Sequence, residues 1–567
     1  MAKKAKKRKS AGKNMHPECH ITTNTSDNQE AVVADSIESC LADLEEATNP
    51  LYFKAKNLDK NCSDANIEGD GMKSRAEKVD GSIFPFSTSV LDSQKERLST
   101  WDAAFESWNR HGSKSYSPGM LPCFETELAR HFHVKELSKF LLDSVPGLKI
   151  NAFERWFMDA KLEENQTGAI LGRIKDDGDN HRKKKRKTEV RDPVLPSGLS
   201  LSLESSKRLI EEIREMGTEE ESASAIVKDL FRRTKAAKQE IASQSFRCFG
   251  QVPQQSNRIQ IERGSYLVSM LYSRKKWKSP FIVKITLQHY DKLKARFLKL
   301  HNKVVQERDL DATVDHRTKA LHALHLLIMV ITLRYSSLSG GQLLDEFRGG
   351  GMQGAIHEQG FDVLKEFFPN NTIFECFASP LNVTLPVFAS AFGEIDWHFG
   401  SVGSLAECSD FKDGCCCEAN PPFTPGFMNF LADWVKARLS HANSNNRSLS
   451  FVVVVPAVHA KDLSLGATRV ASAVKRFAAR AHQHMINSSA CTLHIVLSAK
   501  EHGYVEGAQH LRPTRYKRSL YDTSVILLQS QKAQDAEPLH KERFESSIRQ
   551  AFAERHSEEH RKRAKPK

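Results

Sequence analysis

The tetrapeptide Asn420-Pro421-Pro422-Phe423 is the part of this chain whose residue types point most directly to chemistry. The Asn420 side-chain oxygen and the Pro421 carbonyl are two acceptors, and proline restricts the loop and has no N–H to compete for them. The amine of adenine is a poor nucleophile because its lone pair is delocalised into the ring. Two acceptors that bind both amino hydrogens would let the nitrogen pyramidalise and aim that lone pair at a methyl sulfonium. Phe423 would offer the extruded base a ring for stacking.

A loop of this kind needs no strong general base before attack, and the sequence shows no obvious acid–base pair beside it. Preorganised dipoles and orientation would then supply the rate. The same residues also fit a proline-rich turn with a core phenylalanine, because Asn-Pro and Pro-Pro are common in loops. The tetrapeptide alone leaves both interpretations open.

The position of the tetrapeptide favours the catalytic interpretation. It follows a short apolar run at 415–417 and precedes a predicted helix, for which Thr424 suits the N-cap and Pro425 the first position. A strand-to-helix loop of this kind lies at the carboxyl edge of a parallel sheet, where ligands bind. We therefore expect Asn420 and Ser379 to lie at one edge of the sheet, with a shared pocket between them.

Two further strand ends are predicted to bind the cofactor. The first, at 374–382, ends in small residues and a polar loop, which lets a ligand approach the backbone closely. The second, at 399–404, is rich in glycine and serine and fits an ordinary turn equally well. Near it, Glu394 and Asp396 are candidate partners of a ribose or sulfonium group. The predicted cofactor residues are Cys376, Ala378, Ser379, Pro380, Asn382, Asp396, Gly400 and Ser401.

The residues from 366 to 535 have the pattern of an α/β domain. Runs rich in β-branched residues alternate with helical stretches, which predicts parallel βαβ crossovers in a doubly wound, Rossmann-like sheet. The strands are predicted at 372–377, 449–455, 492–497 and 523–528, and the helices at 427–439 and 469–485.

The segments around this domain are predicted to be simpler. Residues 1–95 have no sustained apolar periodicity and are expected to be a disordered basic region. Residues 96–199 are expected to form a small helical region with a basic linker, and residues 536–567 a charged tail with helical structure. Residues 200–365 are predicted to form a mainly helical accessory domain, from amphipathic stretches at 205–216, 223–241 and 287–304.

Cationic and aromatic residues suggest two places for RNA. Trp277 stands among Arg274, Lys276 and other cations, a combination that can hold a phosphate and stack a base, although a helix end with a buried tryptophan fits as well. Tyr516 and Lys517 precede the last strand and could bind phosphates or form an ordinary solvated loop.

The charge of the chain is concentrated in three runs. Residues 1–14, 182–187 and 561–567 hold 18 of the 83 lysines and arginines and no acids, more than the net charge of +13, so the remainder is net negative. Such basic runs can act as nuclear import signals or bind phosphates weakly. They also fit charged segments in solvent that bind no receptor. We expect a nuclear location.

The cysteines and the apolar stretches argue against a disulfide scaffold, a metal site and a membrane span. Eleven cysteines are too few for a disulfide scaffold, and three of them are consecutive at 415–417, which is not metal-ligand spacing. We predict a buried strand there and no metal site. The apolar stretches at 324–333 and 451–455 fall short of the ~20 residues of a membrane span, so no membrane partner is expected.

Three motifs together resemble the phosphorylated-CTD-interacting factor family, the cap-specific adenosine-N6 methyltransferases. They are 375–382 (ECFASPLN), 399–401 (FGS) and 418–423 (EANPPF). The resemblance extends over about 320–530, through 333–335, 340–341, 352–355, 449–451 and 516–517, and through Gly507, Gln509 and His510. Gln509 and His510 thereby join the RNA candidates.

The resemblance implies a helical domain packed on a Rossmann-like methyltransferase core, with S-adenosylmethionine as the donor. It implies capped mRNA as the partner: the substrate would be the first transcribed adenosine, already 2′-O-methylated, beside a 7-methylguanosine cap. All four residues of the family's catalytic loop are present here as residues 420–423, and the resemblance implies that Phe423 stacks on the base.

The sequence also departs from the family. Vertebrate members have an N-terminal WW domain that binds phosphorylated polymerase tails, and a WW fold needs two tryptophans about 20 residues apart. Trp101 and Trp108 are seven apart, so we predict no WW domain and leave binding to the RNA polymerase II tail open. Val458 and His459 replace a Trp-Arg pair, and Pro425 an acidic residue, on the substrate side, which leaves cap specificity open.

Three other functions fit less well. An inactive RNA-binding relative would not need an intact catalytic loop. A DNA adenine methyltransferase would share the tetrapeptide without the context at 375–382. A methyltransferase that acts on internal or small nuclear RNA remains the main alternative.

Overall fold

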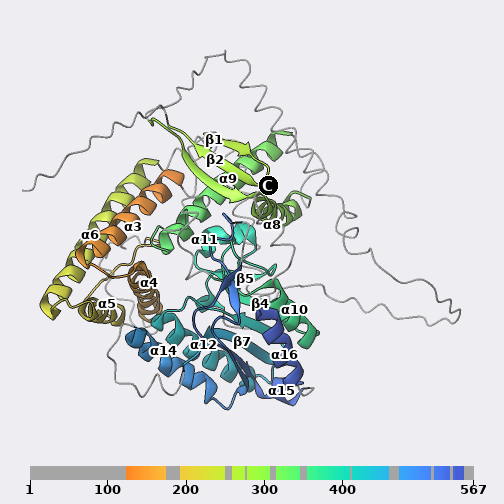
Figure 1. Cartoon of the computed structure of the whole chain (residues 1–567). Helices are drawn as coiled ribbons and strands as arrows, with labels where there is room; N and C mark the ends of the chain where they lie inside the picture. The colour runs from red at the N-terminus through yellow and green to blue at the C-terminus, as the bar shows by residue number, and fades with distance from the viewer. Residues whose placement is uncertain are drawn as a thin grey trace, which may run out of the picture. The chain divides into compact units, whose positions relative to one another are not determined.

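The computed structural model describes residues 123–173, 192–248, 258–274, 277–306, 314–341, 343–344, 354–408, 411–458, 471–512, 516–536 and 540–553 (Figure 1). Contacts divide the chain after Arg75, and all of these residues belong to the unit from Ala76 to Lys567. The predicted disordered segment 1–95 and the three basic runs lie outside the described residues.

A six-stranded mixed sheet forms the centre of the predicted α/β domain. Its strand order is β5-β4-β6-β7-β11-β8, and β5, β4, β6 and β7 run parallel, whereas β11 is antiparallel to both of its neighbours. The prediction of parallel strands alternating with helices is confirmed; the antiparallel strand was not foreseen. The bounds are β4 Thr372–Ala378, β5 Phe388–Ser390, β6 Cys415–Ala419, β7 Leu449–Pro456, β8 Cys491–Leu497 and β11 Thr523–Gln529.

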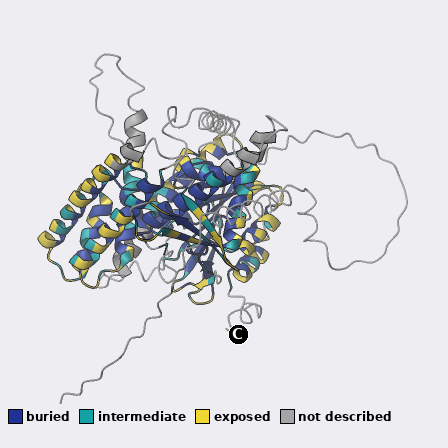
Figure 2. Cartoon of the chain, turned by 90° about the horizontal axis from the view of Figure 1, so that it is seen from above, coloured by how far each residue is buried: buried dark blue, intermediate teal, exposed yellow. Residues whose placement is uncertain are grey.

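Helices cover both faces of this sheet (Figure 1). On one face pack α12 (Pro425–Ser444) and α14 (Ala471–Ile486), and on the other α10 (Glu358–Phe367) and α16 (Lys541–Phe552). Successive side chains of β6 point to opposite faces of the sheet. Cys415 and Cys417 therefore pack in the core on the α12 side, and Cys416 packs in the core on the α10 side. Figure 2 shows the sheet as a buried centre, with exposed residues on the outer faces of the helices.

A second group of elements precedes the sheet. Its helices are α3 (Phe124–Ser144), α4 (Ile150–Arg173), α5 (Glu204–Glu215), α6 (Glu220–Cys248), α8 (Leu287–Gln306) and α9 (Val314–Leu338). Between α6 and α8 lies an antiparallel sheet of β1 (Ile259–Arg263), β2 (Leu267–Tyr272) and β3 (Phe281–Thr286). The predicted helices are present, but the mainly helical description of 200–365 missed this sheet.

Helix α9 holds the one described stretch long and apolar enough to cross a membrane, Leu321–Leu338. Within the protein, 89% of that stretch is buried, which is the situation of a core helix. The remaining short elements are α11 (Gly393–Asp396), the 3₁₀ helices η2 (Trp397–Phe399) and η3 (Leu405–Glu407), β9 (Gly503–Val505), β10 (Tyr516–Arg518) and α15 (Gln531–Asp535).

The predicted boundaries of the α/β domain differ from the structure at both ends. Helix α10 begins at Glu358, before the predicted start at 366, and its Phe361 is fully buried against the sheet. Helix α16 lies in the segment 536–567 predicted as a charged tail, yet Phe544 and Phe552 belong to the core. The apolar side of α16 therefore packs in the core of the α/β domain, and the helix is part of that domain rather than a tail.

Candidate active site

The loop after β6 lies at the carboxyl edge of the parallel strands. Strands β4 and β6 are neighbours in parallel register, with Glu375 opposite Glu418. Ser379 and Asn420 therefore begin the loops that leave the same edge of the sheet. This placement agrees with the sequence-based expectation, whereas the shared pocket between the two residues stays a prediction.

Asn420 presents a buried acceptor. Its side chain is 7% exposed, and Nδ2 donates to the Gly354 carbonyl at 2.9 Å. Because a carbonyl only accepts, this hydrogen bond fixes which end of the amide is the oxygen. Oδ1 has no hydrogen-bond partner among the described residues. An unpaired buried acceptor costs about 1–3 kcal/mol, so the site is arranged to receive a donor.

The two prolines continue the loop in a tight turn. The Thr424 N–H donates to the Pro422 carbonyl at 2.7 Å, so this carbonyl takes part in the turn itself. Thr424 is the N-cap of α12, its hydroxyl accepts from the Phe427 N–H at 3.2 Å, and Pro425 follows at the first helical position. The predicted start of the helix is confirmed.

Phe423 lies among aromatic rings. It is partly buried and meets Tyr504 and Tyr521 edge to face, with centroids 6.0 Å and 5.9 Å away. Tyr521 is 40% exposed, so the group reaches the surface. The sequence did not single out either tyrosine, because each is an isolated aromatic near a strand end.

Two buried carboxyl groups lie behind the loop. Glu375 and Glu418 are paired in register on adjacent strands, and Glu375 accepts from the Thr384 and Leu385 N–H groups at 3.0 Å each. Burial raises the pKa of Glu375 to about 7 and that of Glu418 well above its ordinary value, the latter also because of the neighbouring Glu375. Both shifts favour the protonated, neutral form of this pair.

The first predicted cofactor segment forms a closed turn. The Ser379 N–H and hydroxyl both donate to Asn382 Oδ1, at 2.7 and 2.9 Å, and Pro380 is buried between them. Ala378 contacts Phe388, and the Cys376 side chain faces the core shared with α12. Any contact of Cys376 with a cofactor would therefore involve its backbone.

The second predicted segment is bound to β5. Ser401 shares a hydrogen bond with Ser390 at 2.7 Å. At Gly400 φ is +100° and an added Cβ would lie 2.8 Å from the Pro386 carbonyl, so glycine is required. Asp396 is fully buried and accepts from the Tyr335 hydroxyl at 2.5 Å, and burial raises its pKa to about 7. A ribose contact through this carboxyl stays a prediction.

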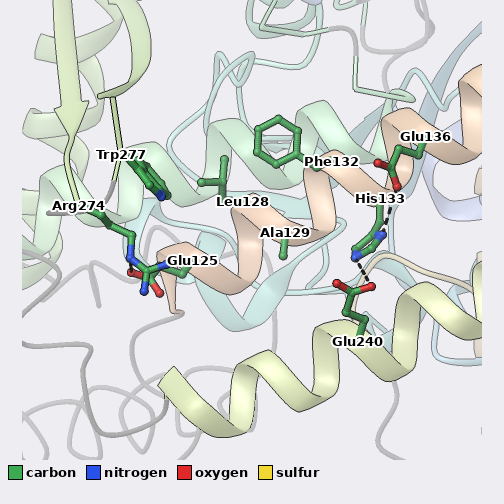
Figure 3. Close-up of a pocket in the computed structure, with 9 residues that line it drawn as sticks. All are labelled: Glu125, Leu128, Ala129, Phe132, His133, Glu136, Glu240, Arg274 and Trp277. Atoms are coloured by element: carbon green, nitrogen blue, oxygen red, sulfur yellow. Dashed lines mark ion pairs between the residues drawn. The ribbon is translucent and has the colours of Figure 1, made fainter. Parts of the chain in front are cut away.

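The predicted basic patch around Trp277 is more acidic than expected. Arg274 pairs with the buried Glu125 at 3.1 Å and lies over the Trp277 ring at 5.9 Å. Both line a cavity of about 310 Å³ in which Glu125, Glu136 and Glu240 also lie (Figure 3). Within the protein the Arg274 cation is thus paired with a carboxylate. The contact of Arg274 and Trp277 with RNA stays a prediction. Lys276 lies outside the described residues.

Gln509 and His510 are core residues rather than surface contacts. Both side chains are buried; Gln509 bonds to His289 at 3.3 Å, and the His510 carbonyl accepts from the Thr286 N–H at 2.7 Å. Burial lowers the pKa of His510 to about 4, so its ring is neutral. They link the turn after β9 to the start of α8. Their contact with RNA stays a prediction.

Tyr516 and Lys517 lie on β10, which pairs with β9. The Tyr516 ring stacks on His357 at 5.1 Å between centroids, and Lys517 is exposed opposite Tyr504. Their contact with RNA stays a prediction.

Comparison with known proteins covers the segment that holds the loop. Residues 303–507 match a family model described as "Phosphorylated CTD interacting factor 1 WW domain". Over 200 residues, the chain is 32% and 31% identical to proteins from Mus musculus and Homo sapiens, each named mRNA (2'-O-methyladenosine-N(6)-)-methyltransferase. These residues are 35% of this chain and 24% and 25% of the relatives, so the chain matches about a quarter of their length.

The description of the family model contradicts the prediction that the chain lacks a WW domain. That prediction rested on the spacing of Trp101 and Trp108, which lie outside the match and outside the described residues. The matched residues include the elements from α9 to β9. The prediction is withdrawn.

Proposed function

We propose that this chain is an S-adenosylmethionine-dependent methyltransferase that methylates N6 of the 2′-O-methyladenosine beside the mRNA cap. The observation that carries the proposal is the buried Asn420 oxygen at the carboxyl edge of the sheet, oriented by Gly354 and without a partner among the described residues. The names of the mouse and human relatives support the substrate.

The residues present fit a methyl donor beside this loop. Strand β4 ends at Ala378 and Ser379 follows it. The small side chains of both residues let a ligand approach the backbone at the edge where the loop of Asn420 begins. When bound, S-adenosylmethionine supplies an electrophilic methyl group on a sulfonium. The turn 379–382 and the loop at 400–401 are the segments that would hold it.

The chain's own residues would orient the amine. Asn420 Oδ1 and the Pro421 carbonyl accept the two amino hydrogens, which localises the lone pair on nitrogen, and Phe423 supports the base by stacking. A bound donor would supply its methyl group to this lone pair and keep the C–S electrons as a neutral thioether, and the nitrogen would release one proton to solvent. Orientation and fixed dipoles supply the rate.

One assay separates this proposal from its alternatives. Purified chain is incubated with labelled donor and matched RNAs that are capped or uncapped, begin with A or G, and have or lack an internal or small nuclear RNA site, alongside a DNA duplex. We expect label only on capped RNA that begins with 2′-O-methyladenosine, and a rate of labelling ~10²–10³-fold lower with Asn420→Ala. Label on internal sites or on DNA would replace the proposed substrate, and no label on any of them would reject the enzyme.

We also propose a nuclear location, which the basic runs at 1–14, 182–187 and 561–567 support. A fluorescent fusion should accumulate in the nucleus, and replacing the basic residues of these runs by glutamine should release it to the cytoplasm. Unchanged accumulation in the variant would show that the runs do not direct import.

Contact with the phosphorylated tail of RNA polymerase II is a further proposal, supported by the description of the matched family model. Fluorescence anisotropy with phosphorylated and unphosphorylated heptad-repeat peptides tests it. Selective binding of the phosphorylated peptide is expected, and equal or absent binding would reject it.

A further inference from the structure

The exit of the catalytic loop is held by a residue far away in the sequence. Asp159 lies on α4 and is 1% exposed. One of its carboxylate oxygens accepts from the Thr424 hydroxyl, and the other accepts from the Gly426 N–H at 3.0 Å. Thr424 directly follows Phe423, so this carboxylate contacts the chain one residue beyond the loop.

The fit between the two helices is close. An added Cβ at Gly426 would overlap the Asp159 carboxylate, so glycine is the residue that allows α12 to begin there. Arg208 on α5 donates to Asp159 at 2.9 Å and balances its charge. A buried carboxylate that accepts from three groups on two other helices has little freedom to move.

The loop is thereby fixed at both of its ends. At the entrance, Asn420 Nδ2 is bound to the Gly354 carbonyl, and at the exit Thr424 is bound to Asp159. The Thr424 N–H also donates to the Pro422 carbonyl. A displacement of Thr424 would therefore also move Pro422.

We propose that Asp159 is a positioning residue for the catalytic loop: through Thr424 and Gly426 it sets where α12 begins, and so where Phe423 and the proline carbonyls lie. This inference rests on the proposed function. It assigns a role in the reaction to α4, which lies outside residues 303–507, the segment that the family model matches.

The test compares Asp159→Ala with a matched control. Glu212→Ala also removes a buried carboxylate, one that pairs with Arg155 between the same helices, α4 and α5. Among the described residues its hydrogen bonds are to Arg155 and not to α12. We expect Asp159→Ala to slow single-turnover methylation of capped RNA about 10- to 100-fold, because misplaced groups lose orientation. Donor affinity should stay within several-fold. Glu212→Ala should lower the melting temperature but leave the rate unchanged.

Conservative variants refine the comparison. Asp159→Asn keeps the shape and should recover part of the rate, and Thr424→Ser keeps the hydroxyl and should be close to the parent. Thr424→Val has the same size but no hydroxyl and should resemble Asp159→Ala. Equal rates for Thr424→Ser and Thr424→Val would overturn the proposal.

Amide hydrogen exchange provides a readout that does not depend on activity. The amides of Thr424 and of residues 426–428 should exchange faster in Asp159→Ala than in the parent or in Glu212→Ala, because the first turn of α12 loses its anchor. If the parent methylates no substrate, the proposed function fails, and the exchange result still decides whether Asp159 holds the loop. Unchanged protection, or an equal loss of rate in the two alanine variants, would overturn the inference.

Discussion

An amide is suited to position 420 because its nitrogen donates a hydrogen bond to the backbone while its oxygen remains an acceptor. The nitrogen is anchored by the Gly354 carbonyl, and the oxygen at the other end is left without a partner among the described residues. A carboxylate at this position would have no hydrogen to donate to Gly354. The orientation of the acceptor therefore depends on the contact made by the other half of the side chain.

Replacing Asn420 should affect the chemical step more than folding or donor binding. Asn420→Ala removes one of the two proposed acceptors, and loss of a preorganised group of this kind costs ~10²–10³ in rate. Donor affinity should stay within several-fold. Single-turnover methylation, donor titration and a melting curve measure the three effects. A parental rate, or a variant that merely unfolds, would remove the proposed role of this residue.

Phe423 should respond differently, because its contribution is a ring face. Phe423→Ala should weaken both the binding of the RNA and turnover, since stacking of a base on an aromatic ring contributes ~1–3 kcal/mol. Phe423→Tyr keeps the face and should retain part of the activity. RNA titrations and turnover of the two variants give the comparison, and equal losses would contradict stacking on the ring, which lies beside Tyr504 and Tyr521, as its role.

At the scale of elements, the main strands were predictable and several contacts were not. Runs of β-branched residues placed β4, β7, β8 and β11 within one residue at each end. Strands β1, β2 and β3 were missed because they are only five or six residues long and lie between long amphipathic helices. The core position of α16 could have been found, since Phe544, Ile548 and Phe552 recur at helical spacing.

Only those parts of the candidate site that lie within one continuous stretch of sequence could be predicted. The tetrapeptide, its N-cap and its place after a strand are properties of one stretch of sequence. The partners of that stretch, Gly354 and Asp159, are 66 and 265 residues away from the atoms they bind. No periodicity or spacing connects residues at such separations, because the packing of whole helices brings them together.

The paired strands β4 and β6 should make stability depend on pH. Burial raises the pKa of Glu375 to about 7 from an ordinary 4.5, so the folded chain holds a proton that the unfolded chain releases. The free energy of unfolding should therefore fall as pH rises from about 4.5 to 7. Melting temperatures at several pH values should fall more steeply for the parent than for Glu375→Gln. Asp396 adds to the slope in both, and parallel curves would contradict the assignment.

At the scale of the whole described unit, a buried ionic network joins the helices to the sheet domain. Arg334 on α9 is 4% exposed and pairs with Glu127 on α3 and Glu394 on α11. Arg130 extends the network from Glu127 to Asp192. Burial opposes the charge of each group, but the pairing raises the pKa of Arg334 and lowers that of Glu127.

Breaking this network should be costly. Arg334→Ala leaves Glu127 buried with one fewer partner, and removal of one member of a buried pair costs about 3–5 kcal/mol in the free energy of unfolding. Arg543 pairs with Glu366 at the surface, so Arg543→Ala should cost less than about 1 kcal/mol. Urea denaturation of both variants measures the difference, and equal costs would show that the network is not a main support of the fold.

Helix α16 also sets an order of events during synthesis. The ribosome makes every strand of the large sheet before it reaches Lys541, yet Phe544, Ile548 and Phe552 form part of the cover of one face. Until these residues emerge, that apolar face lacks part of its cover. A nascent chain of this protein is thus exposed to aggregation late in translation, when chaperones that bind apolar surface would matter most.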